Sequence, residues 1–367
     1  MKRARKTSGC GHRPRGEPAK TPHRPAGIQA VAPVRSSRAA SVLVLALWTL
    51  FFLGAIAVAV GSTVAMSLRA AERLRADALG WTLATAGINQ AMAEAAKDTN
   101  GWDALSEPWA ENEALFRNVE LAAGRWSVSW MDRSVPGSPR VHYGLRDEDG
   151  KVNLRLASTN LLTAFFSVAG GLSESAAARL AGAVGEYRRA PSVLTGSAVT
   201  TYGTRDKPRS ERLLSLYEAR LVEGMTAELF ARIAPYSTVF GDDQGSGLVN
   251  LNTAAPTVLR SVALACGVSE ADALVKLIMD FRRAGNGFRN GARGMVDLWR
   301  QLREFDPSRA MLQGAFLSLG RGNMVTVRST CFGATAEGWV RGETGAVTRI
   351  AFVFDRKSGA VRYWREE

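Results

Sequence analysis

The chain has 367 residues, of which 46% are hydrophobic and 22% charged, and its net charge is +13. This composition excludes a fully disordered chain, and the length allows two or three compact domains. A charge of +13 would suit a nucleic-acid-binding protein. However, residues 1–40 hold ten Lys and Arg against one acid, Glu17, and so carry +9 of the total. The rest of the chain is only slightly basic.

Residues 1–40 are rich in Pro, Gly and Ala and poor in large apolar residues. Such a segment buries too little surface to offset its chain entropy, so we predict a disordered basic tail. No charged residue then occurs between Arg38 and Arg69. A transmembrane helix needs about 20 apolar residues, whereas the apolar region of a cleaved signal, the alternative, is usually about 7–15. The basic tail places the N-terminus in the cytoplasm and everything after about residue 66 outside.

We predict one long helix over residues 41–97, because no proline interrupts it. In its second half, apolar residues are spaced alternately four and three apart, which is typical of a buried helical face. The residues predicted to form that face are Leu74, Ala78, Trp81, Thr85, Ile88 and Met92.

Two β regions flank a helical region. Residues 119–146 contain short alternating runs around "SVPGSP", which predict a strand, a turn and a strand. Residues 321–367 alternate similarly around "RGETGA" and "RKSGA", which predicts about four antiparallel strands. Four tryptophans near the first β region are expected in the core, with a partner surface as the alternative: Trp102, Trp109, Trp126 and Trp130.

The helical region between them contains a duplication. "DEDGKVNL" begins at Asp147, and "DDQGSGLVNL" begins at Asp242. Each is followed by a Gly-x-Ser-Glu segment, at Gly171 and Gly267, and later by a matching "YRRA" or "FRRA". Matched segments in the same order indicate two copies of one helical unit. In each copy we expect the glycine to end one helix and the serine, Ser173 or Ser269, to cap the next.

Four passages together resemble the minor pseudopilin K of the bacterial type II secretion system (general secretion pathway protein K). They are Arg38–Ser41 with the apolar run after it, "EPWAENEALFRNVEL" at 107–121, the paired Val-Asn-Leu segments at 152–154 and 249–251, and the terminal "VRYWRE". The resemblance covers about residues 38–367. It implies an α+β fold: a pilin-like long N-terminal transmembrane helix packed on an antiparallel sheet. An all-α domain of two duplicated units, similar to sterile-alpha-motif and helix-hairpin-helix modules, is inserted into that fold.

The expected organisation has six parts. They are a cytoplasmic tail or prepilin leader (1–40), the long helix (41–97, transmembrane over about 41–66), a first pilin-like part (98–150), a first helical unit (151–241), a second helical unit (242–320) and a second pilin-like sheet part (321–367).

The resemblance also implies processing by prepilin peptidase between Ala40 and Ser41, with alanine where glycine is usual. Leu45 is the fifth residue after that bond, where major pilins carry a glutamate. A carboxylate within the bilayer is costly unless it is paired, so its absence fits a subunit at a filament tip. A plain transmembrane anchor would carry leucine there as well.

The function implied by the resemblance is assembly of the periplasmic pseudopilus and capping of its tip, for export of folded proteins. Implied partners are other minor pseudopilins, the major pseudopilin, prepilin peptidase and the lipid of the bacterial inner membrane, with a single pass and a periplasmic C-terminal domain. We expect neither a nucleic-acid partner nor an enzyme, because His142 is the only histidine after the apolar segment and completes no catalytic set.

The second copy also resembles the helix-hairpin-helix module of membrane-anchored periplasmic DNA-binding proteins in competence systems. Its hairpin has a single glycine, Gly267, and Glu270 and Asp272 would repel a phosphate. DNA binding therefore remains the second hypothesis, and salt-dependent DNA binding by the exported part would support it.

The only cofactor considered is calcium, which prefers oxygen ligands. The candidate ligands are Asp147, Asp149, Asp242 and Asp243, with solvated turn acids as the alternative. We expect turn and cap roles for Asn153, Asn250 and Asn252. Cys266 and Cys331 could pair outside the cytoplasm or remain free thiols.

Overall fold

A computed structural model describes residues 38–121, 124–132, 139–189, 213–241, 247–289, 294–342 and 348–367. The predicted basic tail lies outside these residues, except for its last three. The chain divides into two compact units, residues 1–67 and 68–367.

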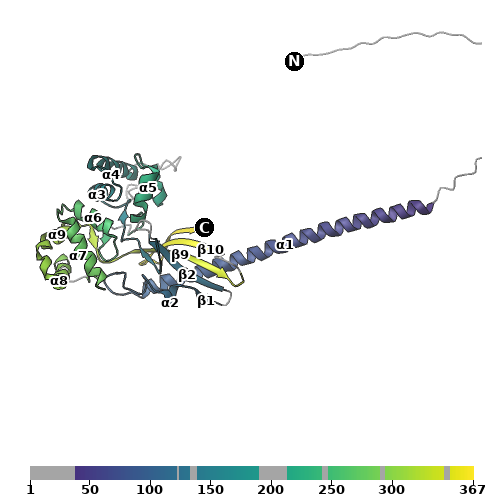
Figure 1. Cartoon of the computed structure of the whole chain (residues 1–367), viewed down its shortest axis with the longest axis horizontal. Coiled ribbons are helices and arrows are strands. Elements are labelled where there is room, and N and C mark those ends of the chain that lie inside the picture. The colour runs from purple at the N-terminus through teal and green to yellow at the C-terminus, as the bar shows by residue number, and fades with distance from the viewer. Residues whose placement is uncertain are drawn as a thin grey trace, which may run out of the picture. The chain divides into compact units, whose positions relative to one another are not determined.

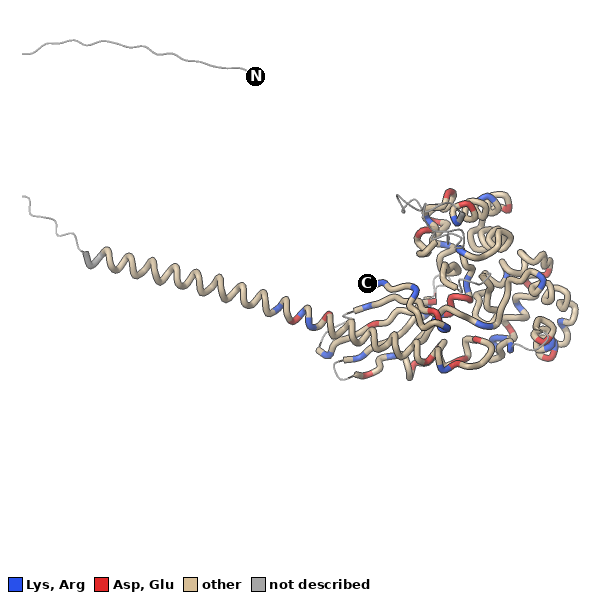
Figure 2. Tube along the Cα trace, turned by 180° about the vertical axis from the view of Figure 1, so that it is seen from behind, with Lys and Arg blue, Asp and Glu red and all other residues tan. Residues whose placement is uncertain are grey.

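Helix α1 (Arg38–Lys97) contains the predicted transmembrane segment. It is the one helix of the described ranges that is long and apolar enough to cross a membrane. Figure 2 shows its first part free of charged residues. The apolar side chains there are exposed to solvent, as expected for a surface that lipid would cover.

A seven-stranded antiparallel sheet forms the main β element of the second unit (Figure 1). Its path is β1-β2-β9-β10-β11, with β3 added on β2 and β4 on β9. The bounds are β1 Val119–Leu121, β2 Gly124–Asp132, β3 Arg140–Tyr143, β4 Arg146–Asp147, β9 Cys331–Val340, β10 Thr348–Asp355 and β11 Val361–Glu366. The first and last parts of the chain therefore share one sheet, and a short helix, α2 (Glu113–Phe116), precedes β1.

The second half of α1 packs on this sheet, and the predicted face is only partly correct: Ile88 and Met92 contact the core, and Trp81 donates to Glu366 of β11. The side chains of Leu74 and Trp81 are 70% and 44% exposed, and among the six predicted residues only Ile88 is fully buried. The face that contacts the sheet consists of Gly80, Leu83, Ala84, Gly87, Ile88, Ala91 and Ala95. Small residues allow the helix backbone to approach the strands closely, so this interface does not follow the large apolar residues.

Each copy of the duplicated unit forms its own succession of helices. The first contains β5 Val152–Asn153, α3 Thr159–Val168, α4 Glu174–Arg189, η1 Leu216–Leu221, α5 Ala227–Ile233, η2 Ala234–Tyr236 and β6 Ser237–Thr238. The second contains β7 Val249–Asn250, α6 Pro256–Ala265, α7 Ala271–Arg283, α8 Met295–Phe305, η3 Pro307–Leu312, α9 Gln313–Arg321 and β8 Val325–Thr326. Helices α3 and α6 pack together, and both copies contribute to one hydrophobic core.

A short parallel strand pair closes each copy. Val152 pairs with Ser237 in β5 and β6, and Val249 pairs with Val325 in β7 and β8. The C-terminal region thus supplies three antiparallel strands to the main sheet, while its fourth predicted strand, β8, pairs in parallel with the second copy. Alternation along a strand does not reveal its partner, which explains this difference.

The predicted helix ends are correct at both glycines and at one of the two serines. Gly171 and Gly267 have φ of +67° and +73°, a left-handed conformation that glycine adopts at little cost. The hydroxyl of Ser173 accepts the N–H of Ala176 at 3.4 Å, which caps α4. Ser269 instead donates to its neighbour Glu270, so α7 has no serine cap.

Candidate functional site

The predicted processing site lies in the first turns of α1. The Ala40–Ser41 bond falls within this helix, and the Leu45 side chain is 67% exposed one turn later. Leu45 is surrounded by other exposed apolar residues of the helix, so its environment fits both interpretations of the missing carboxylate.

The first acidic segment, residues 147–150, forms a buried turn that we call the acidic turn. The Asp147 carboxylate accepts hydrogen bonds from Asn250 Nδ2 (3.1 Å) and Thr253 Oγ1 (2.5 Å) of the second copy. It also accepts one from Ser329 Oγ (2.6 Å), which lies just before β9. The Asp147 carboxylate therefore links the start of the second copy to the segment that precedes β9.

Asp149 and Glu148 extend these links. Asp149 accepts from the backbone N–H and the hydroxyl of Thr330 (2.5 and 2.8 Å), and its carbonyl accepts the N–H of Asn250 at 2.8 Å. Glu148 accepts from Thr238 Oγ1 (2.5 Å) at the end of the first copy and forms an ion pair with Lys151. The acidic turn thus joins both copies to the sheet.

The geometry of these carboxylates is that of structural acceptors. The oxygens of Asp147 and Asp149 receive three backbone N–H groups, from Asp149, Thr330 and Cys331, which cannot serve as metal ligands. These two aspartates alone do not fit a calcium site, which needs six or more oxygens. Asp242 and Asp243 lie outside the described residues, so the calcium site stays a prediction.

Burial changes the titration of the acidic turn. Removal from water, together with the charge of Asp149, raises the pKa of Asp147 to about 7, and burial raises the pKa of Asp149 to about 6. Burial alone would also raise the pKa of Glu148, but Lys151 and Arg146 outweigh it and lower that pKa. Burial lowers the pKa of Lys151 to about 8.

These shifts predict that stability falls as pH rises. An unfolded aspartate titrates near pH 3.9, so the folded chain binds more protons than the unfolded chain between about pH 4 and 7. The contribution is present below pH 4 and lost through pH 6–7, so we expect the free energy of unfolding to fall by roughly 2 kcal/mol between pH 5 and 8. Chemical denaturation across this range measures it. Asp147→Asn should flatten the slope and Asp272→Asn, at an exposed site, should not; an unchanged slope in Asp147→Asn would contradict the assignment.

The three repeated asparagines form turns and cross-links. Asn153 Oδ1 accepts the N–H of Arg155 at 2.9 Å, and Asn250 Oδ1 accepts the N–H of Asn252 at 2.9 Å, which makes the same turn in both copies. Asn252 exchanges two hydrogen bonds with the backbone of Phe288, at 3.0 and 2.7 Å. All three are buried and hydrogen-bonded to protein groups.

The first arginine of each Arg-Arg pair also has the same position in both copies. Arg188 donates to the carbonyls of Leu154 and Ala157, the latter at 2.8 Å. Arg282 donates to the carbonyl of Ala254, the residue equivalent to Ala157, at 2.6 Å. Sequence comparison of the copies detected the motif, but only the structure shows that it holds the turn before the first helix.

A second acidic group lies beside the sheet. Oxygens of Asp98, Asp103 and Glu107 lie within 4.8 Å of one another. Arg356 pairs bidentately with Asp103 (2.6 and 3.0 Å), contacts Asp98 at 3.1 Å, and donates to the carbonyl of Ser329 at 2.9 Å. This group is therefore a buried salt bridge that ties the segment after α1 to the turn after β10.

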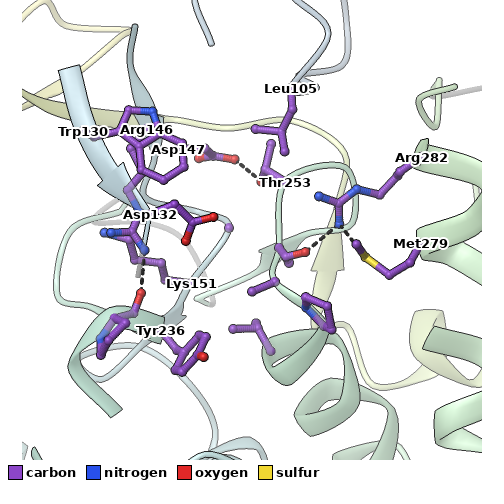
Figure 3. Close-up of a pocket in the computed structure, with 16 residues that line it drawn as sticks. Leu105, Trp130, Asp132, Arg146, Asp147, Lys151, Tyr236, Thr253, Met279 and Arg282 are labelled. Atoms are coloured by element: carbon purple, nitrogen blue, oxygen red, sulfur yellow. Dashed lines mark hydrogen bonds between the residues drawn. The ribbon is translucent and has the colours of Figure 1, made fainter. Parts of the chain in front are cut away.

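A pocket of about 220 Å³ lies between the acidic turn, the end of the first copy and the start of the second. Figure 3 shows Arg146, Asp147 and Lys151 on one side and Arg282 on the other. Arg146 donates to the carbonyl of Pro235 at 2.5 Å and lies over the Trp130 ring. No pattern in the sequence predicted this pocket, because its walls come from six separate segments.

The hairpin of the DNA-binding hypothesis carries Glu270 and Asp272 at the start of α7. Asp272 pairs with Arg260 at 3.0 Å, so a basic side chain beside the hairpin is already neutralised.

Both described cysteines are free thiols: Cys331 is buried, and the Cys266 sulfur lies 3.9 Å from the sulfur of Met324.

The second half of the long helix α1 packs on an antiparallel sheet. The chain leaves this sheet after β4, forms the helical domain and returns to the sheet at β9. This arrangement is a pilin-like α+β fold with a helical insertion. No family model and no curated protein matches the sequence. The structure is similar to one chain in the crystal structure of the GspK-GspI-GspJ complex from the enterotoxigenic Escherichia coli type 2 secretion system. The TM-score is 0.53 at 17% identity, over 82% of this chain and 99% of that chain. The fold implied by the resemblance to pseudopilin K is therefore confirmed.

Proposed function

We propose that this protein is a minor pseudopilin of a type II secretion system, which supports assembly of the pseudopilus and caps its tip. The observation that carries the proposal is the combination of a pilin-like fold with a bulky helical insertion, matched over nearly the whole length of a chain from a pseudopilin complex. The mechanism is assembly: α1 anchors the subunit in the inner membrane and then packs against the corresponding helices of its partners.

The insertion supports a position at the tip. Each helical copy has its own series of helices, and together the described helices add a bulky folded body beside the sheet, from β5 to β8. A body of this size on one subunit would obstruct helical stacking of further subunits around it. The absence of a carboxylate at Leu45 agrees with a subunit that has no neighbour ahead of it.

Co-purification of the full-length chain in mild detergent tests the proposal. Expressed with the other minor pseudopilins of its own secretion system, the chain should form a stable complex that also contains them, and its N-terminal sequence should begin at Ser41 if prepilin peptidase acts before it. The matched control exchanges the apolar part of α1 for an unrelated transmembrane helix. A folded full-length chain that binds none of these partners would contradict the proposed function.

A further inference from the structure

Strand β11 is the last strand on the path of the main sheet, and within the described residues it pairs only with β10. The N–H of Glu367 donates to the carbonyl of Arg349, which lies directly opposite, at 2.9 Å. Because hydrogen-bonded and non-bonded pairs alternate along antiparallel strands, the main-chain groups of Trp364 and Glu366 point away from β10. In the part of the chain that the structure describes, these groups have no partner. The edge of β11 is therefore open.

Two exposed tryptophans lie beside this open edge, on the face of the sheet that α1 covers. The rings of Trp81 and Trp364 are 6.3 Å apart, and their side chains are 44% and 38% exposed. Glu366 Oε1 accepts both indole N–H groups, at 3.0 and 3.2 Å, and so holds the two rings in place. Leu74 lies two turns before Trp81 on the same face of α1 and is also exposed. Aromatic side chains that are both ordered and exposed are typical of protein interfaces.

The charges along β11 leave one carboxylate without a basic partner. Arg362 and Arg365 each pair with an acidic residue of this chain. Glu366 forms no ion pair with any described residue. Open edges are often protected by a bulge, but the register shift of β11 lies near Val361, at the far end of the strand. The end that carries Trp364 and Glu366 is regular and unprotected.

These features identify the occupant of the edge as an extended strand. A second strand satisfies a row of outward main-chain groups along its whole length, whereas the main-chain groups of a helix are already bonded within the helix. Residues that pair across neighbouring strands point to the same face, so the residue opposite Trp364 would lie beside the rings of Trp364 and Trp81. The carboxylate of Glu366 matches a basic residue. The occupant is therefore a strand with an apolar residue and a nearby Lys or Arg.

A second copy of this chain, paired through the same strand, does not fit this surface. Successive turns of α1 follow β2, because Leu83 lies beside Gly124 and Gly87 beside Trp126. Antiparallel pairing of two copies of β11 would therefore reverse the direction of α1 in one copy relative to the other. Subunits that are anchored by this helix in one membrane all run in the same direction.

We propose that β11 accepts a β-strand of another minor pseudopilin, which extends the sheet of this chain and packs an apolar side chain against Trp81 and Trp364. This inference rests on the proposed function, which supplies a partner anchored in the same membrane. It adds the surface that is used and the kind of contact that is made. The membrane helices bring the subunits together, and the added strand sets the register of one folded domain against the next.

Photochemical crosslinking tests the surface in the full-length chain, co-expressed with the other minor pseudopilins of its own secretion system and purified in mild detergent. A benzophenone amino acid in place of Trp364 keeps an aromatic ring there, and irradiation should join it to a strand of one partner. The same label in place of Met311, which is exposed in the second helical copy, is the control and should not reach that strand.

The outcomes of this experiment separate the inference from the proposed function. A crosslink within this chain, a crosslink to a second copy, or no crosslink in a complex that does form would overturn the inference and leave the proposed function intact. Failure of the unaltered chain to form any complex would overturn both.

Hydrogen exchange distinguishes a strand from any other contact at the tryptophans. In the complex, the main-chain N–H groups of Trp364 and Glu366 should exchange at least about tenfold more slowly than in the chain alone. Those of Tyr363 and Arg365 already face β10 and should change little. A crosslink without this alternation would show a different kind of contact and would overturn the added strand.

Two matched lysine variants locate the effect along β11. Trp364→Lys should lower the amount of partner retained by at least about tenfold, as expected for the loss of a tryptophan that anchors an interface. Val361→Lys changes a similarly exposed residue at the far end of the same strand and should leave retention unchanged. Equal retention by the two variants, both shown to be folded by thermal unfolding, would overturn the proposal. If Trp364→Lys does not fold, the crosslink and the exchange pattern decide.

Discussion

Replacing Gly338 with alanine is expected to lower the free energy of unfolding by about 3 kcal/mol, because it would force α1 away from the sheet. Gly338 lies in the middle of the sheet, on β9, opposite Trp126 of β2. A Cβ atom there would collide with the carbonyl oxygen of Gly80 and lie 2.9 Å from the backbone nitrogen of Ala84, both in α1. Backbone atoms cannot rotate away as a side chain can, so the helix itself would have to move.

Guanidinium unfolding of the full-length chain in detergent, followed by tryptophan fluorescence, measures this loss. Gly182→Ala is the matched control, because Gly182 lies inside α4 and nothing occupies the space within 4 Å of its added Cβ. This control should gain about 0.5–1 kcal/mol, since alanine favours a helix interior. Equal stability of Gly338→Ala and the unaltered chain would show that the helix does not contact the sheet as described.

Replacing Arg356 with methionine is expected to cost about 3–5 kcal/mol, the range for removing one partner of a buried ion pair. Asp103 is fully buried, and Arg356 provides two of its hydrogen bonds. Burial raises the pKa of Asp103 to about 6 even with Arg356 in place, so without the arginine its negative charge would be left uncompensated. The same change removes the donor to the carbonyl of Ser329.

The same denaturation assay separates this buried pair from a surface pair. Arg341→Met breaks an exposed pair with Glu120 at 3.8 Å and should cost less than about 1 kcal/mol. Adding Asp103→Asn to Arg356→Met should recover part of the loss, because it removes the unpaired charge. A cost for Arg356→Met no greater than that for Arg341→Met would refute the structural role of the pair.

Local patterns in the sequence predicted the kinds of element and their order. The charge-free run from Ala39 to Leu68 predicted the apolar part of α1, and alternation predicted β2, β3 and the C-terminal hairpins. Matched segments predicted the two helical copies. Each of these signals is a pattern within the sequence itself, so it can be read without knowledge of the tertiary structure.

Contacts between distant segments could not be predicted in the same way. The buried face of α1 was only partly predicted, because most of its interface uses glycine and alanine, whose small size matters only when a strand is present opposite them. The asparagines were expected in turns, but their side chains also bond to Phe240, Ser329 and Phe288, which lie 36 to 87 positions away in the sequence. The pocket beside Arg282 was missed for the same reason, since only folding brings its walls together.

The acidic turn has a structural role that its sequence did not predict. In the first copy, "DEDG" precedes Val-Asn-Leu and becomes buried between three parts of the molecule. Together, the carboxylates of Asp147 and Glu148 accept donors from both copies, which apolar residues could not do. Its acids were predicted to be solvated turn residues or calcium ligands; Asp147 and Glu148 are buried, and the calcium site stays a prediction.

The strand pairs that close the two copies have a consequence for how such a protein could arise and be altered. Because Val152 pairs with Ser237 and Val249 with Val325, each copy leaves and rejoins its surroundings at adjacent points. A segment with neighbouring ends behaves as a cassette: it can be duplicated, shortened or exchanged without moving the strands on either side. The gene could therefore have grown by copying one cassette, and protein engineers could insert a different domain at the same two junctions.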